Sequence, residues 1–318
     1  MFTLNDILIG CEGNFRLHGN THPNPDQVFP SAQHDSRQVG PGDLFIAITG
    51  EKVDGHTFIP TVAQARAGAA LCTNPADNVP PDFLQIVVPD VVKALHAIAR
   101  TRANRQENTI FIGITGSNGK TSTKEAVAAV LEQHAPTLKT YASYNNEIGF
   151  PLTLLRLEPQ HRYAVLEMGA QWVGELAWLC QTIKSPDWSI ITNIGVSHLE
   201  HFGSVEGIFK AKSELVQALR PDGLAILNYD DPKVRLMKEK TQAPTLYYGQ
   251  GEGADVRAID LTGDALRGFH FTLTYRNQQQ PLQLHLPGKH NINIALSAAA
   301  VGLAAGMELS TIVRVLEG

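Results

Sequence analysis

Short apolar runs alternate with longer amphipathic stretches along most of the chain. Before residue 106, the runs at 43–48 and 83–88 predict strands, and the spacing of apolar residues predicts helices over 59–70 and 91–105. The polar stretch 104–108 that follows has the composition of a linker. These elements predict an α/β unit at the start of the chain.

The same alternation continues after the linker, where each short apolar strand is followed by a helical stretch. The predicted strands lie at 110–114, 163–166, 189–192 and 224–227. Such alternation is typical of βαβ units, so we expect a mostly parallel sheet with helices on both faces.

The pattern changes near residue 255, where apolar and polar positions alternate strictly and turn residues separate the runs. The runs at 256–261, 269–275 and 282–286 predict antiparallel strands that extend the edge of the sheet. A helix is expected over 291–305.

The length of 318 residues corresponds to about two domains. We place an N-terminal α/β domain at 1–105 and a central domain at 106–318. Both belong to the α/β fold class.

Composition and charge narrow the functional classes. The net charge is −5 and no basic run is present, which argues against nucleic acid as the main partner. Cys11, Cys72 and Cys180 are too far apart for a disulfide framework or a metal site, which favours a reducing, cytoplasmic location. The N-terminus lacks the basic segment of a signal peptide and 295–307 is too short to span a bilayer, so no membrane insertion is expected.

The segment Gly113–Ser122 has the features of a phosphate-binding loop, because it joins a predicted strand to a predicted helix. Backbone N–H groups at a helix N-terminus attract phosphate, and Gly116 and Gly119 let the backbone come close. Lys120 would reach the outer phosphates, and the Thr121 hydroxyl would bind Mg²⁺. The glycine spacing is a variant of the common one, and the alternative is a turn that contains Gly-Lys-Thr by chance.

Polar residues follow the predicted parallel strands, namely Thr115, Glu167, Asn193 and Asn228. Ligands of open α/β sheets gather at the carboxyl ends of the strands, so these side chains should converge near the loop. Glu167 is a candidate Mg²⁺ ligand. The alternative is a solvated carboxylate at a strand end.

Two further residues are candidates for chemistry. His198 lies just past a strand end and could bind a metal or a phosphate, or could be a surface histidine. Lys212 falls within the apolar stripe of the helix that follows Ser204, so it points inward. An inward lysine must be paired, neutral or modified, unless it snorkels along the helix.

These motifs together resemble the Mur ligases, the ATP-dependent amide-forming enzymes of peptidoglycan synthesis. The segments that carry the resemblance are Asp35–Arg37, Pro41–Phe45, Gly50–His56, Thr115–Thr121, Asn145–Thr153, His198–Ser204 and Ala211–Glu214. Within the family they are most similar to the MurF branch. That branch adds D-alanyl-D-alanine to UDP-N-acetylmuramoyl-tripeptide through an acyl phosphate.

The resemblance implies a set of site residues and two cofactors, ATP and Mg²⁺. Nucleotide contacts are implied for Thr115, Gly116, Ser117, Asn118, Gly119, Lys120, Thr121, Ser122, Asn145, Asn146 and Asn291. Metal binding is implied for Thr121, Glu167, His198 and a carbamylated Lys212, and catalysis for Lys120, Glu167, His198 and Lys212. Contacts to the UDP substrate are implied for Asp35, Ser36, Arg37, Gly50, Asp54 and His56.

The chain departs from the family pattern in two places. The family sequence His-Asn-x-x-Asn is here His290–Ile294, with Asn293 one position early, and such a shift turns a helical side chain by about 100°. The family's third, Rossmann-like domain is not in the sequence, so we expect binding of the UDP substrate with poor turnover, by a monomer. The alternatives are a MurE-type ligase that adds a diamino acid, and a non-catalytic nucleotide-binding module.

Overall fold

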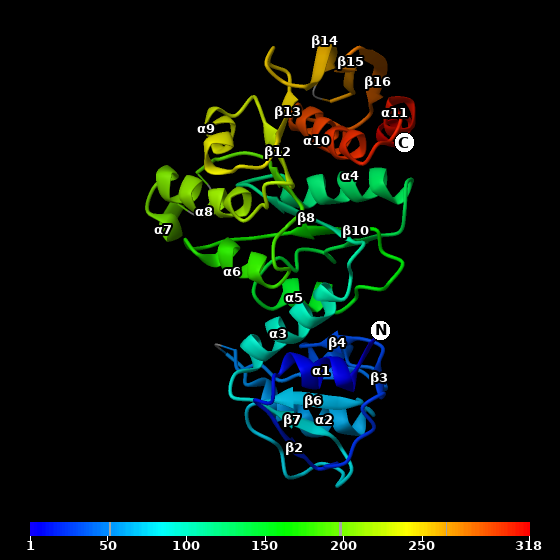
Figure 1. Ribbon diagram of the computed structural model, residues 1–318, viewed down its shortest axis with the longest axis vertical. Coiled ribbons are helices and arrows are strands. Elements are labelled where there is room, and N and C mark those ends of the chain that lie inside the picture. The colour runs from blue at the N-terminus through cyan, green and yellow to red at the C-terminus, as the bar shows by residue number, and fades with distance from the viewer. Residues whose placement is uncertain (51, 197–198, 265) are drawn as a thin grey trace. The chain divides into compact units, whose positions relative to one another are not determined.

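The structure of the protein is a computed structural model that describes residues 1–50, 52–196, 199–264 and 266–318 (Figure 1). The described residues form two compact units. The first unit comprises Met1–Glu107 and Glu147–Pro159, and the second comprises Asn108–Asn146 and Gln160–Gly318. Each unit has its own sheet. No described helix is long and apolar enough to cross a membrane.

The segment Glu147–Pro159 belongs to the first unit, although chain order alone had placed it in 106–318. Its helix α5 (Gly149–Leu154) is buried at every position and packs against α3 (Val91–Asn104). His96 on α3 lies with Nε2 2.8 Å from the carbonyl oxygen of Glu147. Arg102 on α3 donates a hydrogen bond to the Leu157 carbonyl. These contacts join segments that are far apart in the sequence, which local patterns do not reveal.

The first unit contains a five-stranded sheet in the order β2-β7-β6-β5-β4. Its strands are β2 (Arg16–His18), β4 (Ala32–Gln33), β5 (Leu44–Ile46), β6 (Ala69–Cys72) and β7 (Gln85–Val87). All pairings are parallel except that of β2 with β7. Its other elements are β1 (Phe2–Thr3), α1 (Leu4–Gly10), β3 (Val28–Phe29), η1 (Ser36–Gln38), η2 (Gly55–Phe58) and α2 (Ile59–Gln64).

The predicted helix over 59–70 is too long. Helix α2 ends at Gln64, because Arg66 adopts a left-handed φ of +64° and the chain turns through Gly68 into β6. An added Cβ at Gly68 would lie 2.6 Å from the carbonyl oxygen of Gly42, so this turn requires a glycine.

The second unit contains a nine-stranded sheet in the order β16-β15-β14-β13-β12-β11-β8-β10-β9. Its strands are β8 (Ile110–Thr115), β9 (Thr137–Lys139), β10 (Tyr163–Glu167), β11 (Trp188–Ile191), β12 (Leu224–Asn228), β13 (Thr245–Gly249), β14 (Val256–Asp264), β15 (Gly268–Tyr275) and β16 (Gln278–Leu284). Pairings from β9 to β14 are parallel, and β14, β15 and β16 pair antiparallel. The predicted parallel sheet with an antiparallel edge is therefore confirmed.

Helices cover both faces of this sheet (Figure 1). They are α4 (Lys120–Glu132), α6 (Glu175–Gln181), α7 (Leu199–Phe202), α8 (Val205–Gln217), α9 (Pro232–Leu236), η3 (Met237–Lys240), α10 (His290–Ala304) and α11 (Leu309–Glu317). Ile112 and Ile114 of β8 join one apolar core with α4 and α10. Gly113 between them faces α8, where an added Cβ would lie 2.7 Å from Leu215 Cδ1. Successive residues of a strand point to opposite faces, which separates the two helical layers.

Candidate nucleotide and metal site

The phosphate loop joins the carboxyl end of β8 to the first turn of α4. Gly119, the residue before the helix, has φ +79°, and no atom lies within 4 Å of the position of an added Cβ. Gly116 is required for a different reason. An added Cβ there would lie 1.8 Å from Oγ1 of Thr192, the residue that follows β11. Only a glycine at this position lets the loop pack directly against Thr192.

Thr192 and Asn193, which follow β11, hold the loop in place through hydrogen bonds to Asn118. The backbone N–H of Asn118 donates to Asn193 Oδ1 at 3.0 Å, and Asn193 Nδ2 donates to the Asn118 carbonyl at 3.0 Å. Thr192 Oγ1 donates to the same carbonyl at 2.7 Å. These bonds fix the loop backbone against the end of β11. The position of Asn193 after a predicted strand agrees with this geometry, whereas the contact of Thr192 has no signal in the sequence pattern.

Lys120 lies folded over the loop. Its Nζ donates to the carbonyls of Gly116 at 2.9 Å and Ser117 at 3.3 Å. Burial lowers the pKa of Lys120, and the negative charge of Glu167 opposes that shift. The Lys120 ammonium can replace its hydrogen bonds to these two carbonyls by hydrogen bonds to phosphate oxygens, with little movement of the loop.

Glu167 and Thr121 form the part of the site that fits a hard cation. The Glu167 side chain is buried, with 1% of the residue exposed, so the alternative of a solvated carboxylate is wrong. Its Oε1 accepts hydrogen bonds from Thr121 Oγ1 at 3.1 Å and from Asn145 Nδ2 at 2.7 Å. Its Oε2 is buried and has no hydrogen-bond partner among the described residues. A buried carboxylate oxygen without a donor, beside a hydroxyl, fits Mg²⁺.

Lys212 is buried on α8, with 3% of the residue exposed, which excludes a side chain that snorkels to solvent. Burial and, to a smaller extent, the charge of Lys120 lower the pKa of Lys212 to about 7, and the charge of Glu175 opposes the shift. An amine with such a pKa is partly neutral at physiological pH. His198, the remaining metal ligand in the prediction, lies outside the described residues, and no three described His, Cys, Asp or Glu side chains form a metal cluster.

A cavity of about 230 Å³ lies beside the loop. It is lined by Asn118, Gly119, Thr123, Thr192, Asn193, Asn228, Tyr248, His290, Asn293 and Ile294. The last three residues lie on one face of α10 because they are spaced i, i+3 and i+4. The one-residue shift turns the asparagine side chain by about 100°, but Asn293 still lines the cavity, together with Ile294 at the usual position. Its Oδ1 is buried without a hydrogen-bond partner in the described part of the chain.

Asn291, in contrast, is not among the residues that line the cavity. Its Nδ2 donates to the Pro287 carbonyl at 2.6 Å and thereby braces the turn before α10. The family pattern favours Asn291 over Asn293, because its spacing takes no account of which helical face meets the cavity.

The predicted substrate residues of the first unit form two separate groups in the structure. Arg37 donates to the Asp35 carboxylate through Nε and Nη2, and this pairing lowers the pKa of Asp35 to about 2. In the second group, His56 Nδ1 lies 2.6 Å from Asp54 Oδ1, and His56 Nε2 lies 3.0 Å from the backbone nitrogen of Thr73.

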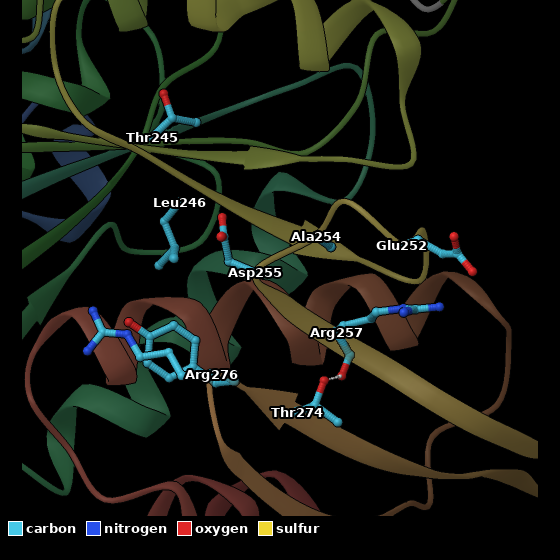
Figure 2. Close-up of a pocket in the computed structure, with 9 residues that line it drawn as sticks. Thr245, Leu246, Glu252, Ala254, Asp255, Arg257, Thr274 and Arg276 are labelled. Atoms are coloured by element: carbon cyan, nitrogen blue, oxygen red, sulfur yellow. Dashed lines mark hydrogen bonds between the residues drawn. The ribbon is translucent and has the colours of Figure 1, made fainter.

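A larger pocket of about 520 Å³ lies elsewhere on the second unit (Figure 2). Thr245 and Leu246 at the start of β13, Asp255 and Arg257 at the start of β14, and Arg276 after β15 line it. These are the amino ends of the parallel strands, whereas the phosphate loop lies at the carboxyl end of β8. Ligands of open α/β sheets bind at carboxyl ends, so volume alone does not identify the site here.

The family described as Mur ligase middle domain matches residues 114–302, which include the phosphate loop, Glu167, Lys212 and the start of α10. The chain belongs to the Mur ligase family. A second family, described as Mur ligase family, catalytic domain, matches residues 31–106.

Several relatives with similar sequences are D-alanyl-D-alanine-adding ligases, and several similar structures are those of MurF. The UDP-N-acetylmuramoyl-tripeptide--D-alanyl-D-alanine ligase of Escherichia coli K12 is 36% identical over 90% of this chain and 63% of its own length. A crystal structure of MurF from Acinetobacter baumannii has a TM-score of 0.88 and 32% identity, over 99% of this chain and 68% of that one. MurF from Thermotoga maritima in complex with ADP has a TM-score of 0.79 and 27% identity, over 91% of this chain and 65% of that one. The chain thus spans less than two thirds of the E. coli relative.

Proposed function

We propose that this chain takes part in the ATP-dependent formation of an amide bond between UDP-N-acetylmuramoyl-tripeptide and D-alanyl-D-alanine. The observation that carries the proposal is that the phosphate loop, held by Asn193, lies beside the buried carboxylate of Glu167, whose Oε2 has no hydrogen-bond partner among the described residues. The names of the relatives support the choice of substrates. A cytoplasmic location goes with this proposal, and Cys11, Cys72 and Cys180 are free thiols.

When bound, ATP would supply the phosphoryl group that turns the tripeptide carboxylate into an acyl phosphate, from which the amine of D-alanyl-D-alanine displaces phosphate. Lys120 would transfer its hydrogen bonds from the loop carbonyls to the outer phosphates. Thr121 and Glu167 would hold Mg²⁺ through the hydroxyl and the free Oε2. Asn145 would keep Glu167 oriented through its bond to Oε1. Asn293 would meet the nucleotide base in the cavity of about 230 Å³.

Lys212 would enter this mechanism as a carbamate. Its neutral amine attacks CO₂, a C–N bond forms and a proton is released, so a buried cation becomes an anion that can bind metal. The pKa of about 7 supports this step because it leaves a neutral amine available. With ¹³C-labelled bicarbonate, a carbamate NMR signal should appear and should vanish in Lys212→Ala. Labelling that persists in Lys212→Ala would remove this residue from the proposal.

The decisive experiment is calorimetry of the chain with MgATP and, separately, with the UDP-linked tripeptide. We expect Lys120→Ala to weaken ATP binding by about a hundredfold or more, which is nearly 3 kcal/mol, and to leave UDP-substrate binding unchanged. Lys139→Ala, which removes a lysine 38% exposed outside the loop, is the matched control. Equal loss of both ligands would contradict the assignment of the loop.

Phosphate release assays then separate the candidate functions. The proposal predicts release that requires both the UDP-tripeptide and D-alanyl-D-alanine. Release that instead requires a diamino acid would indicate a MurE-type ligase. Tight binding of both nucleotides without any release would indicate a binding module.

A further inference from the structure

Helix α4 carries a second lysine, Lys124, that sequence reasoning did not select. It is completely buried, at 0% exposure, one helical turn after Lys120. Its position has the same spacing as Val127, Ala128 and Leu131, so it lies on the apolar stripe of the helix. A buried ammonium is retained only where its surroundings satisfy it, so its partners indicate what it does.

The partners of Lys124 lie on three segments. Its Nζ donates to the carbonyl oxygen of Ala142 at 2.7 Å and pairs with Glu125 Oε1 at 2.9 Å. Glu167 Oε2, the oxygen without a hydrogen bond among the described residues, is 4.0 Å away. Lys124 therefore touches the loop between β9 and α5 and approaches the carboxylate that faces the phosphate loop.

Ala142 has an unusual backbone conformation. Its φ of +45° lies in the left-handed region, which residues with a Cβ disfavour. Such strain persists only where the surroundings enforce it, and it concentrates at functional sites. The carbonyl of this strained residue is the one that Lys124 holds.

The loop around Ala142 leads directly to Asn145. Asn145 donates to Glu167 Oε1 at 2.7 Å, and its carbonyl accepts a hydrogen bond from the Gly169 N–H at 2.8 Å. The fit is close, since an added Cβ on Gly169 would lie 2.9 Å from Asn145 Oδ1. A shift of the loop at Ala142 would move the side chain that orients Glu167.

We propose that Lys124 is a positioning residue that clamps the strained loop at Ala142, so that Asn145 holds Glu167 in the orientation that binds the metal ion. The inference rests on the proposed nucleotide and metal site. Its loop component can be tested without any ligand.

The first measurement is hydrogen exchange of residues 140–146 and of the Gly169 amide. In Lys124→Met we expect exchange there to rise by about tenfold or more, because the strained loop loses its clamp. The matched control is Lys139→Met, since Lys139 pairs with the same Glu125 carboxylate at 2.7 Å. Exchange no faster in Lys124→Met than in Lys139→Met would overturn the proposal.

The double variant Lys124→Met with Ala142→Gly separates the clamp from a general loss of folding. Glycine adopts a left-handed φ without strain, so the loop should return toward its original exchange rate by about fivefold to tenfold. A purely structural role of Lys124 in the core predicts that Ala142→Gly changes exchange equally with and without Lys124, and equal changes in the two backgrounds would contradict the clamp. This variant also keeps the test valid if Lys124→Met alone folds poorly.

The second measurement is Mn²⁺ binding in the presence of ADP, followed by electron paramagnetic resonance. We expect about tenfold weaker Mn²⁺ binding in Lys124→Met and partial recovery in the double variant. Electrostatics alone predicts the opposite sign, because removing a cation 4.0 Å from Glu167 Oε2 should tighten Mn²⁺ binding. Tighter or unchanged binding would therefore reject the positioning role. Failure of the unmodified chain to bind Mn²⁺ with ADP would reject the proposed function, while the exchange data would still decide the clamp.

Discussion

Two lysines of the second unit are buried almost equally, at 0% for Lys124 and 3% for Lys212, but their surroundings differ. Lys124 has a carbonyl and a carboxylate within hydrogen-bond distance. Among the residues that the structure describes, none accepts a hydrogen bond from Lys212 Nζ, and the nearby charge of Lys120 repels it. The same residue type is therefore held by a carbonyl and a carboxylate on α4 and is a partly neutral amine on α8. The partners, rather than burial, decide which chemistry is open to each lysine.

The largest expected effect is the loss of stability when Lys124, the lysine with hydrogen-bond partners, is replaced. Lys124→Met should lower the free energy of unfolding by about 3–5 kcal/mol, because it leaves the Ala142 carbonyl and nearby carboxylates without their cation. Urea denaturation of the whole chain, followed by a signal from the second unit, measures this loss. A loss below about 1 kcal/mol would show that the partners of Lys124 contribute little.

The same substitution at Lys212 should have the opposite sign. The folded-state pKa is about 7 against an ordinary value of 10.5, so between these pH values the unfolded state binds more protons and stability rises with pH. Below pH 7 the full penalty of the buried charge is present. Lys212→Met should therefore stabilise by about 2–4 kcal/mol below pH 7 in CO₂-free buffer, and the gain should fall as pH rises toward 10.5. A gain that does not depend on pH would show that packing rather than charge is responsible.

A smaller effect is expected at the loop that Lys124 holds. Ala142→Gly should stabilise by about 1 kcal/mol, because it removes the strain of φ +45°. Gly119→Ala is the reciprocal control, since its φ of +79° lies in the same region and the space around it is open, so it should destabilise by about 1 kcal/mol. Thermal unfolding measures both. Destabilisation by Ala142→Gly would contradict the strain.

The smallest effect concerns the influence of one lysine on another. Lys120→Ala removes a positive charge that lowers the pKa of Lys212, so that pKa should rise. The titration of ¹³C-dimethylated lysine resonances can follow this shift, with Lys139→Ala as the control that leaves it unchanged. No shift in Lys120→Ala would mean that burial alone sets the pKa of Lys212.

Much of the fold follows from local pattern. The alternation of apolar strands and amphipathic helices predicted the parallel sheet, and the change to strict alternation near residue 255 predicted its antiparallel edge. The short strand β9 and the strand β13 carry weaker signals and were not predicted. The assignment of Glu147–Pro159 to the first unit depends on contacts with α3, which no local window contains.

Some features of the candidate site likewise follow from local sequence, and others depend on tertiary contacts. The phosphate loop could be predicted because strand, glycines, lysine and helix are contiguous. The apolar stripe of α8 predicts the inward position of Lys212, and the same rule applied to α4 places Lys124 inside. The sequence identifies Asn145, Thr121 and Glu167 as separate candidates. It does not show that Thr121 and Asn145 both bind the Glu167 carboxylate, because the three residues lie on different segments of the chain.

By itself, the sequence determined the strand–loop–helix context of the phosphate loop and the inward position of Lys212, because both depend on periodicity and on residues adjacent in the chain. The tertiary structure alone decided that Asn293 rather than Asn291 lines the cavity and that Glu167 keeps one oxygen free. It also decided that Lys124 has hydrogen-bond partners, whereas Lys212 lies near the positive charge of Lys120. The physical reason is that the state of a buried polar group depends on the atoms within a few ångströms, and folding brings those atoms from distant parts of the chain.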